Sequence, residues 1–208
     1  ARARGAQAAG LFADLAKAYE YVDHGKLVHF ARQRDFPPDI LSVCLSMYAG
    51  PRRIVNQGLC SHWFTAGGQT IVAGCGMATT LLKVYTLTLF DALSRYHPRV
   101  ELHVCVGDVD LFATSPTAHA AAGNLSRAAN FLLDMFERAL RLQVAFRKCV
   151  LLVSSASAAG HMRRELQRRP CLKRIGIHSW GKKLGIQFGL NSRRRTSLLK
   201  QRTQKAKL

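Results

Sequence analysis

Residues 12–24 have the sequence FADLAKAYEYVDH, and this stretch decides the fold that the chain predicts. Residues 11–15 form a short apolar segment typical of a buried strand, with Asp14 near its end. A turn follows, and then an aromatic residue, Tyr19. A carboxylate at a strand end, followed closely by a flat ring, suits a site where a metal-bound phosphate meets that ring. We therefore expect a phosphate-handling site on this strand.

Four later stretches extend the pattern along the chain. The first precedes a long predicted helix, the second is a predicted hairpin, and the last two each contain a predicted strand. They are residues 73–80 (AGCGMATT), residues 102–113 around a turn at 107–108, residues 146–155 (FRKCVLLVSS) and residues 183–189 (KLGIQFG). Helices are predicted for 23–34, for the segment after Pro37, for 77–96 and, most strongly, for 118–142.

Taken together, these stretches resemble the catalytic blocks of reverse transcriptases of the non-LTR retroelement type. The first block of that family is F-x-D-L-x-K-A-F-D-x-V-D-H, which residues 12–24 follow closely. The later stretches are similar, in order, to Q-G-C-P-x-S-P, Y-x-D-D, N-x-x-K-(T/S)-x-x-hydrophobic-S and the primer grip Y-L-G-hydrophobic-x-F. Five blocks in the correct order, over roughly residues 10–190, are far more specific than any single block.

The resemblance implies an RNA-directed DNA polymerase that uses Mg²⁺ or Mn²⁺, deoxynucleoside triphosphates, an RNA template and a DNA primer. Two-metal nucleotidyl transfer needs carboxylates to hold the ions. The implied metal ligands are Asp14, Asp108 and the backbone carbonyl of Leu15. Lys148 takes the place of a lysine near the triphosphate, with Asp14 and Asp108 as its catalytic partners. Nucleotide-binding positions are Lys17, Ala18, Tyr19 and Gly74, with Tyr19 packing against the incoming sugar, and the primer-grip positions are Leu184 and Gly185.

One position departs from the family at the third block. Residues 105–108 align with Y-x-D-D, so the first aspartate of the pair is Gly107. Sliding the strand so that Asp108 serves instead would turn its side chains to the wrong face, and Asp110 lies further along the return strand. Loss of a metal ligand removes several kcal/mol of charge stabilisation, at about 1.4 kcal/mol per tenfold in rate. We therefore expect weakened metal binding and an inactive copy.

For the fold, we expect an α+β polymerase palm. Its antiparallel sheet has the catalytic hairpin at the centre and packs on two or three helices. Residues 1–10 are a remnant of fingers or a leader, 11–192 form the palm, and 193–208 form a basic tail. The chain begins at Ala1, about a dozen residues before the first block, so we expect a fragment whose fingers and thumb are largely missing.

Charge and cysteine content limit the function classes. The 208 residues include 31 Lys and Arg against 12 Asp and Glu, a formal charge of +19, which favours a polyanion such as nucleic acid. No run of 18 apolar residues could span a membrane. The six cysteines form no C-x-x-C pair, so structural zinc is not expected and an intracellular, cytoplasmic or nuclear location fits best.

Two alternatives remain at this point. The first is a non-catalytic nucleic-acid-binding module on the same palm, held by basic residues that include Arg52, Arg53, Arg147 and Lys148. The second is an unrelated basic RNA-binding protein, in which case Asp14 and Asp108 should lie far apart in the fold. The sequence does not define an oligomeric state.

Overall fold

The computed structural model describes residues 6–65, 67–168, 170–183 and 186–189. The chain divides into two compact units, each described by itself below. The first contains the described residues of the segments Ala1–Asp14, Leu93–Asp134 and Val144–Leu208. The second contains those of Leu15–Ala92 and Met135–Gln143.

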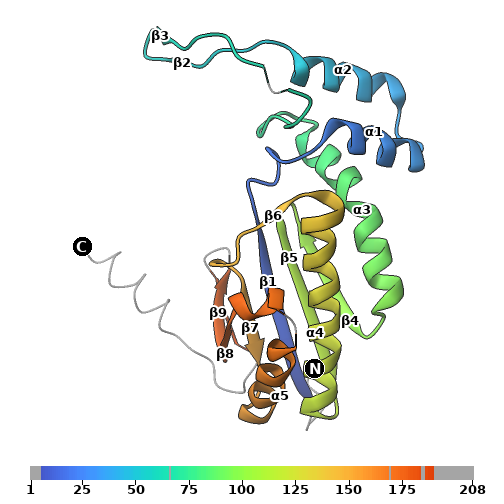
Figure 1. The fold of residues 1–208 in the computed structure, drawn as a ribbon, viewed down its shortest axis with the longest axis vertical. Coiled ribbons are helices and arrows are strands. Elements are labelled where there is room, and N and C mark those ends of the chain that lie inside the picture. The colour runs from blue at the N-terminus through green and yellow to red at the C-terminus, as the bar shows by residue number, and fades with distance from the viewer. Residues whose placement is uncertain (1–5, 66, 169, 184–185, 190–208) are drawn as a thin grey trace. The chain divides into compact units, whose positions relative to one another are not determined.

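The first unit is built on a six-stranded sheet with the strand order β4-β5-β1-β7-β8, and β6 also pairs with β1 (Figure 1). Its strands are β1 (Gln7–Ala16), β4 (Val100–Cys105), β5 (Asp108–Ser115), β6 (Gln143–Val144), β7 (Val150–Val153) and β8 (Gly176–His178). Its helices are α4 (Ala118–Asp134), α5 (Ala156–Gln167) and the 3₁₀ turn η2 (Pro170–Arg174), and a separate hairpin pairs β9 (Trp180–Lys183) with β10 (Ile186–Gly189).

A row of leucines across the three central strands forms the core of this sheet. Leu11 pairs in register with Leu111 of β5 on one side and with Leu151 of β7 on the other, and all three are fully buried. Side chains alternate between the two faces of a strand, so the half-buried Asp108, Asp110 and Phe112 lie on the face opposite Leu111. Helices α4 and α5 cover the apolar face, which leaves the acids on the other one (Figure 1).

The sheet differs from the predicted one in two respects. It is mixed and not antiparallel throughout, because β8 joins β7 in parallel. The β4–β5 hairpin lies at one edge and not at the centre, because β5 pairs with β1 on its other side while β4 has a single neighbour in the strand order. Strand β1 is also longer than expected, since it begins at Gln7 and thus includes residues assigned to the leader.

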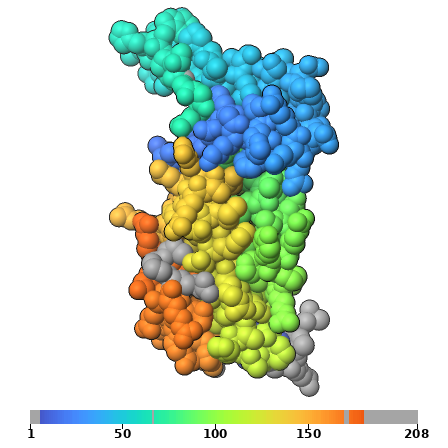
Figure 2. All heavy atoms as spheres, turned by 45° about the vertical axis from the view of Figure 1, so that its right-hand side comes forward, coloured from blue at the N-terminus to red at the C-terminus, as the bar shows by residue number. Residues whose placement is uncertain are grey.

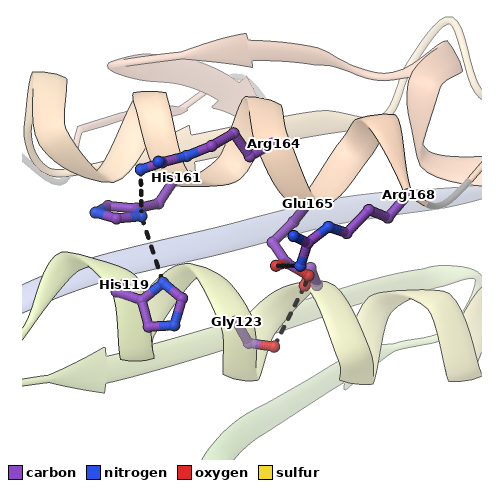
Figure 3. A network of polar contacts seen from close by, with 7 residues as sticks. His119, Gly123, His161, Arg164, Glu165 and Arg168 are labelled. Carbon is purple, nitrogen blue, oxygen red and sulfur yellow. Dashed lines mark hydrogen bonds and ion pairs between the residues drawn. The ribbon is translucent and has the colours of Figure 1, made fainter.

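Helices α4 and α5 are joined by polar contacts at two places along their length (Figure 3). The His119 and His161 Nδ1 atoms lie 3.4 Å apart, and Arg164 Nη2 lies 2.8 Å from His161 Nδ1. Further along, the buried Ser126 hydroxyl donates to Glu165 at 3.0 Å, and Arg168 pairs with the same carboxylate at 3.5 Å. The contacts fix α5, a helix that the sequence analysis did not predict, against the strongest helix of the chain.

The second unit contains three α-helices, a short ribbon and a π-helix. Their bounds are α1 (His24–Gln33), α2 (Pro38–Ala49), β2 (Val55–Asn56), β3 (Leu59–Cys60), α3 (Ala78–Tyr96, whose last turn enters the first unit) and η1 (Met135–Leu140). Asp23 caps α1 by accepting a hydrogen bond from Lys26 N at 2.8 Å. Proline starts α2, as predicted.

The π-helix η1 interrupts the single helix predicted for 118–142. Its carbonyls are held by side chains from elsewhere in the same unit. The Tyr85 hydroxyl donates to Leu140 O at 2.8 Å, and the Lys26 ammonium donates to Ala139 O. These donors supply partners to carbonyls at the end of the helix, where backbone partners run out.

Candidate functional site

The two aspartates singled out by sequence lie directly opposite each other. In the β1–β5 ladder Asp14 pairs in register with Asp108, as Phe12 does with Asp110. Directly opposed residues of antiparallel strands point to the same face, with Cβ atoms about 4.5–5.5 Å apart. Asp14 and Asp108 therefore form a carboxylate pair, which excludes the arrangement expected of an unrelated fold.

The turn of the β4–β5 hairpin explains this register. Only Val106 and Gly107 separate the paired residues Cys105 and Asp108, and Val106 adopts a φ of 56°. The sequence argument that Asp108 would need a register slip to face Asp14 is therefore wrong, because the return strand starts at Asp108 itself. Gly107 lies in the turn, where it contributes no carboxylate.

Lys148 forms an ion pair with the first aspartate. Its Nζ lies 2.9 Å from Asp14 Oδ2, at the tip of an exposed side chain that reaches a largely buried carboxylate. The hydrogen bond and the charge of Asp14 raise the pKa of Lys148, with a further contribution from the charge of Asp108. The Asp14 backbone oxygen accepts from Ala145 N at 2.8 Å, which brings the segment before Lys148 next to β1.

Next to the carboxylates, aromatic side chains pack on the same face of the sheet. The Phe112 ring lies edge-on to Phe12 and to His103, each at 5.8 Å between centroids. A Cβ on Gly10 would approach the Phe112 ring to 2.8 Å, so this position accepts glycine alone without movement. His103 pairs in register with Asp110.

These residues fit a pair of divalent ions poorly. Two-metal sites need several oxygen ligands around both ions. Here the turn position is a glycine, and the ammonium of Lys148 already lies against Asp14. Within the described ranges, no group of three or more His, Cys, Asp or Glu side chains is arranged to hold a metal ion. The backbone carbonyl of Leu15 lies one residue beyond the last β1–β5 register pair.

The second unit brings the aromatic residue of the first block next to the second block. The Tyr19 hydroxyl lies 3.3 Å from Thr79 Oγ1, and Ile71 N donates to Tyr19 O at 2.9 Å. The other predicted nucleotide-binding residues lie in the same unit. Lys17 is exposed in a turn with φ 51°, Ala18 is buried, and Gly74 has φ 87° with open space where a Cβ would lie.

Beside Gly74, Cys75 accepts a hydrogen bond from the Tyr48 hydroxyl at 3.2 Å. This bond lowers the pKa of the Cys75 thiol, and the backbone N–H of Met77 adds to the effect. The predicted primer-grip residues Leu184 and Gly185 lie outside the described residues, between β9 and β10. The basic tail at 193–208 also lies outside them.

Sequence reasoning missed the Lys148–Asp14 ion pair and helix α5. The ion pair had no local signal, since 133 intervening positions separate the two residues. The helix did have one: Ser155 caps it by accepting from Ala158 N at 3.2 Å, and Ala158, Met162 and Leu166 follow at helical spacing.

Comparisons with known proteins support the fold. No family model matches the chain, and no curated protein matches it. Solved structures of telomerase from Candida tropicalis are similar to it. The apo enzyme has a TM-score of 0.61 at 11% identity over 92% of this chain. The apo enzyme truncated from its C-terminal domain has 0.60 at 12% over 88%, and the complex with a TWJ fragment of telomeric RNA has 0.60 at 12% over 92%.

The chain covers 33%, 34% and 30% of those three telomerase chains, about a third of their length. At such identities the likeness concerns the fold alone. The chain therefore has a mixed α/β fold similar to part of telomerase. Among the described residues, none of the helices combines the length and the apolar character needed to cross a membrane.

Proposed function

We propose that the chain is the palm region of a reverse transcriptase of the non-LTR type that binds nucleic acid but does not polymerise. The observation that carries the proposal is the register pairing of Asp14 with Asp108. The hairpin turn beside this pair contains Gly107 where the family has an aspartate. The fold and the order of the five blocks favour a polymerase ancestor. The glycine in the turn and the Lys148–Asp14 ion pair favour a site without polymerase activity.

The ion pair supports weak binding of Mg²⁺ or Mn²⁺. A divalent ion at Asp14 would have to displace the Lys148 ammonium or accept its repulsion at close range. The missing carboxylate at Gly107 removes a ligand that could offset this cost. Asp108 and Asp110 remain on the same face, so the site keeps negative charge without a full ligand set.

The charge of the chain supports binding to a template–primer hybrid. Its formal charge of +19 favours polyanions through phosphate contacts and counterion release. Binding of this kind needs no metal at the carboxylates. We therefore expect affinity for RNA–DNA hybrids that falls steeply with salt, together with absent nucleotide incorporation.

Primer extension on poly(rA)/oligo(dT) with Mg²⁺ or Mn²⁺ tests the proposal. Wild type should not extend, whereas Gly107→Asp should, because the carboxylate is restored beside Asp14 and Asp108. A restored contribution of about 3 kcal/mol corresponds to an increase of about a hundredfold in rate. The matched control is the double variant Asp14→Asn/Gly107→Asp, which should again be silent.

Extension by wild type would contradict the proposed inactivity and show that Asp108 or Asp110 suffices for catalysis together with Asp14. If neither protein extends while both bind the hybrid, nucleic-acid binding stands but Gly107 alone does not account for the missing activity. If neither binds the hybrid at about 50 mM salt, the nucleic-acid function itself fails.

A further inference from the structure

The β2–β3 ribbon of the second unit exposes an unusual share of large apolar side chains. Every described residue from 53 to 65 is exposed, including Trp63 at 64% and Phe64 at 45%. Figure 2 shows this blue-green segment as a projecting lobe beside α2. Isolated two-stranded ribbons are only marginally stable in water, so such exposure indicates a surface for a ligand or partner.

The ribbon has a defined geometry despite its exposure. Arg52 and Phe64 exchange backbone hydrogen bonds at 2.9 Å in both directions, and Ser61 and Ile54 pair further along. The Arg53 guanidinium lies 5.2 Å from the centroid of the Trp63 ring. A ring with a cation against it is thus already in place before any ligand arrives.

Charge selects the kind of ligand. The chain contains no Asp or Glu between Asp39 and Asp91, so the ribbon lies in an acid-free stretch. It carries Arg52 and Arg53, and a guanidinium group matches phosphate geometry. Arg52 Nη2 already donates to Tyr48 O, so Arg53 supplies the exposed guanidinium. An apolar protein partner would gain nothing from these charges. A polyanion with accessible flat rings satisfies both the aromatic and the cationic groups.

We propose that the aromatic-cationic cluster of Arg52, Arg53, Trp63 and Phe64 binds single-stranded nucleic acid. Unpaired bases stack on the exposed rings, and Arg53 contacts a flanking phosphate. Duplexes hide the faces of their bases, so the cluster discriminates against them. The proposal deepens the nucleic-acid binding described above and rests on it, but it concerns residues other than the carboxylates.

Tryptophan fluorescence gives a direct test, because the chain has two tryptophans, Trp63 and Trp180. In the Trp180→Phe variant, Trp63 is the sole indole. Titration with single-stranded dT or rU oligonucleotides should quench its emission, whereas an RNA–DNA hybrid of equal length should not. Comparing the two oligonucleotides shows whether the sugar matters.

Affinity measurements supply the second arm. Trp63→Ala should weaken single-strand binding about tenfold, a loss that corresponds to about 1.4 kcal/mol. The matched control is Leu59→Ala, since Leu59 is 78% exposed on the same ribbon but has no ring. This control should change affinity less than twofold, and hybrid binding should be the same in both variants.

Unchanged single-strand affinity in Trp63→Ala would overturn the inference, as would equal quenching by single strand and hybrid. If wild type binds the hybrid but no single strand, the inference fails and the proposed function stands. If wild type binds neither, both fail. Equal losses in Trp63→Ala and Leu59→Ala would point to general apolar contact and count against base stacking.

Discussion

The carboxylate pair and the ribbon meet negatively charged ligands in opposite ways. The carboxylates of Asp14 and Asp108 repel a phosphate unless a cation lies between the carboxylates and the phosphate. Here the nearby cation is Lys148. Arg53 is exposed in a stretch without acids and can contact a phosphate directly. Under the proposed function, binding and chemistry use different residues, so the loss of one metal ligand would leave nucleic-acid binding in place.

The two regions also differ in what they contribute to the fold. The carboxylates lie on strands whose opposite face is fully buried, so their geometry depends on the core. All described residues of the ribbon from 53 to 65 are exposed. Substitutions there should therefore change ligand binding and leave the stability of the fold largely unchanged.

The largest expected effect on stability comes from a substitution in the core beneath the carboxylate pair. Leu11→Ala should lower the free energy of unfolding by about 3 kcal/mol, since Leu11 is fully buried between Leu111 and Leu151 and truncation leaves a cavity. Val55→Ala, 62% exposed on the ribbon, should cost less than about 0.5 kcal/mol. Urea unfolding of the two variants measures the contrast, and similar losses in both would contradict it.

A smaller effect is expected at the glycine beside Phe112. Gly10→Ala should destabilise by about 1–2 kcal/mol, because the new Cβ would meet the Phe112 ring at 2.8 Å. Gly160→Ala is the matched control, since it lies in α5 with open space around it and should stabilise by up to about 1 kcal/mol. Thermal unfolding compares them, and a neutral Gly10→Ala would show that the ring moves at little cost.

Salt dependence sharpens the ribbon's side of the comparison. Arg53→Gln should reduce the slope of log affinity against log salt by about 0.7 for single strands, the value for one phosphate contact. Lys83→Gln, an exposed lysine on α3, should leave the slope unchanged. Fluorescence anisotropy at several salt concentrations gives the slopes, and equal slopes in wild type and Arg53→Gln would show that Arg53 does not contact the nucleic acid.

The smallest effect concerns the α4–α5 contact that supports the sheet. Burial lowers the pKa of His161, and the charges of Arg164 and His119 add to this. The unfolded chain then binds more protons, so stability is lost as pH falls below about 6.5 toward the folded pKa. His161→Gln should reduce this loss, because glutamine does not titrate.

Melting temperatures between about pH 7.5 and pH 5.5 measure the His161 effect. Arg164→Gln is the intermediate case, because it removes one of the causes that lower the pKa and keeps the imidazole. Identical pH profiles for wild type and His161→Gln would contradict the linkage.

Local patterns predicted much of this molecule. The alternation of residues 109–113 and the apolar segment around Leu11 were sufficient to predict the hairpin and the first strand. Strand order was not predictable, because the β5–β1 and β7–β8 pairings join segments far apart in sequence. The face of the sheet on which Asp108 lies depends on the length of the turn. A two-residue turn places Cys105 opposite Asp108, and the alignment of the third block contained no information on turn length.

The π-helix η1 has a consequence for comparing this chain with others. An i→i+5 turn holds one residue more than an α-turn, and here Tyr85 and Lys26 fasten its carbonyls. A homologue with one residue fewer in this region can form an ordinary α-turn and keep everything after it in place. An alignment gap then belongs within Met135–Leu140. If the gap were placed after Lys148, the alignment would pair Lys148 with a different residue of the homologue. The homologue would then be read as lacking the fourth block although it has it.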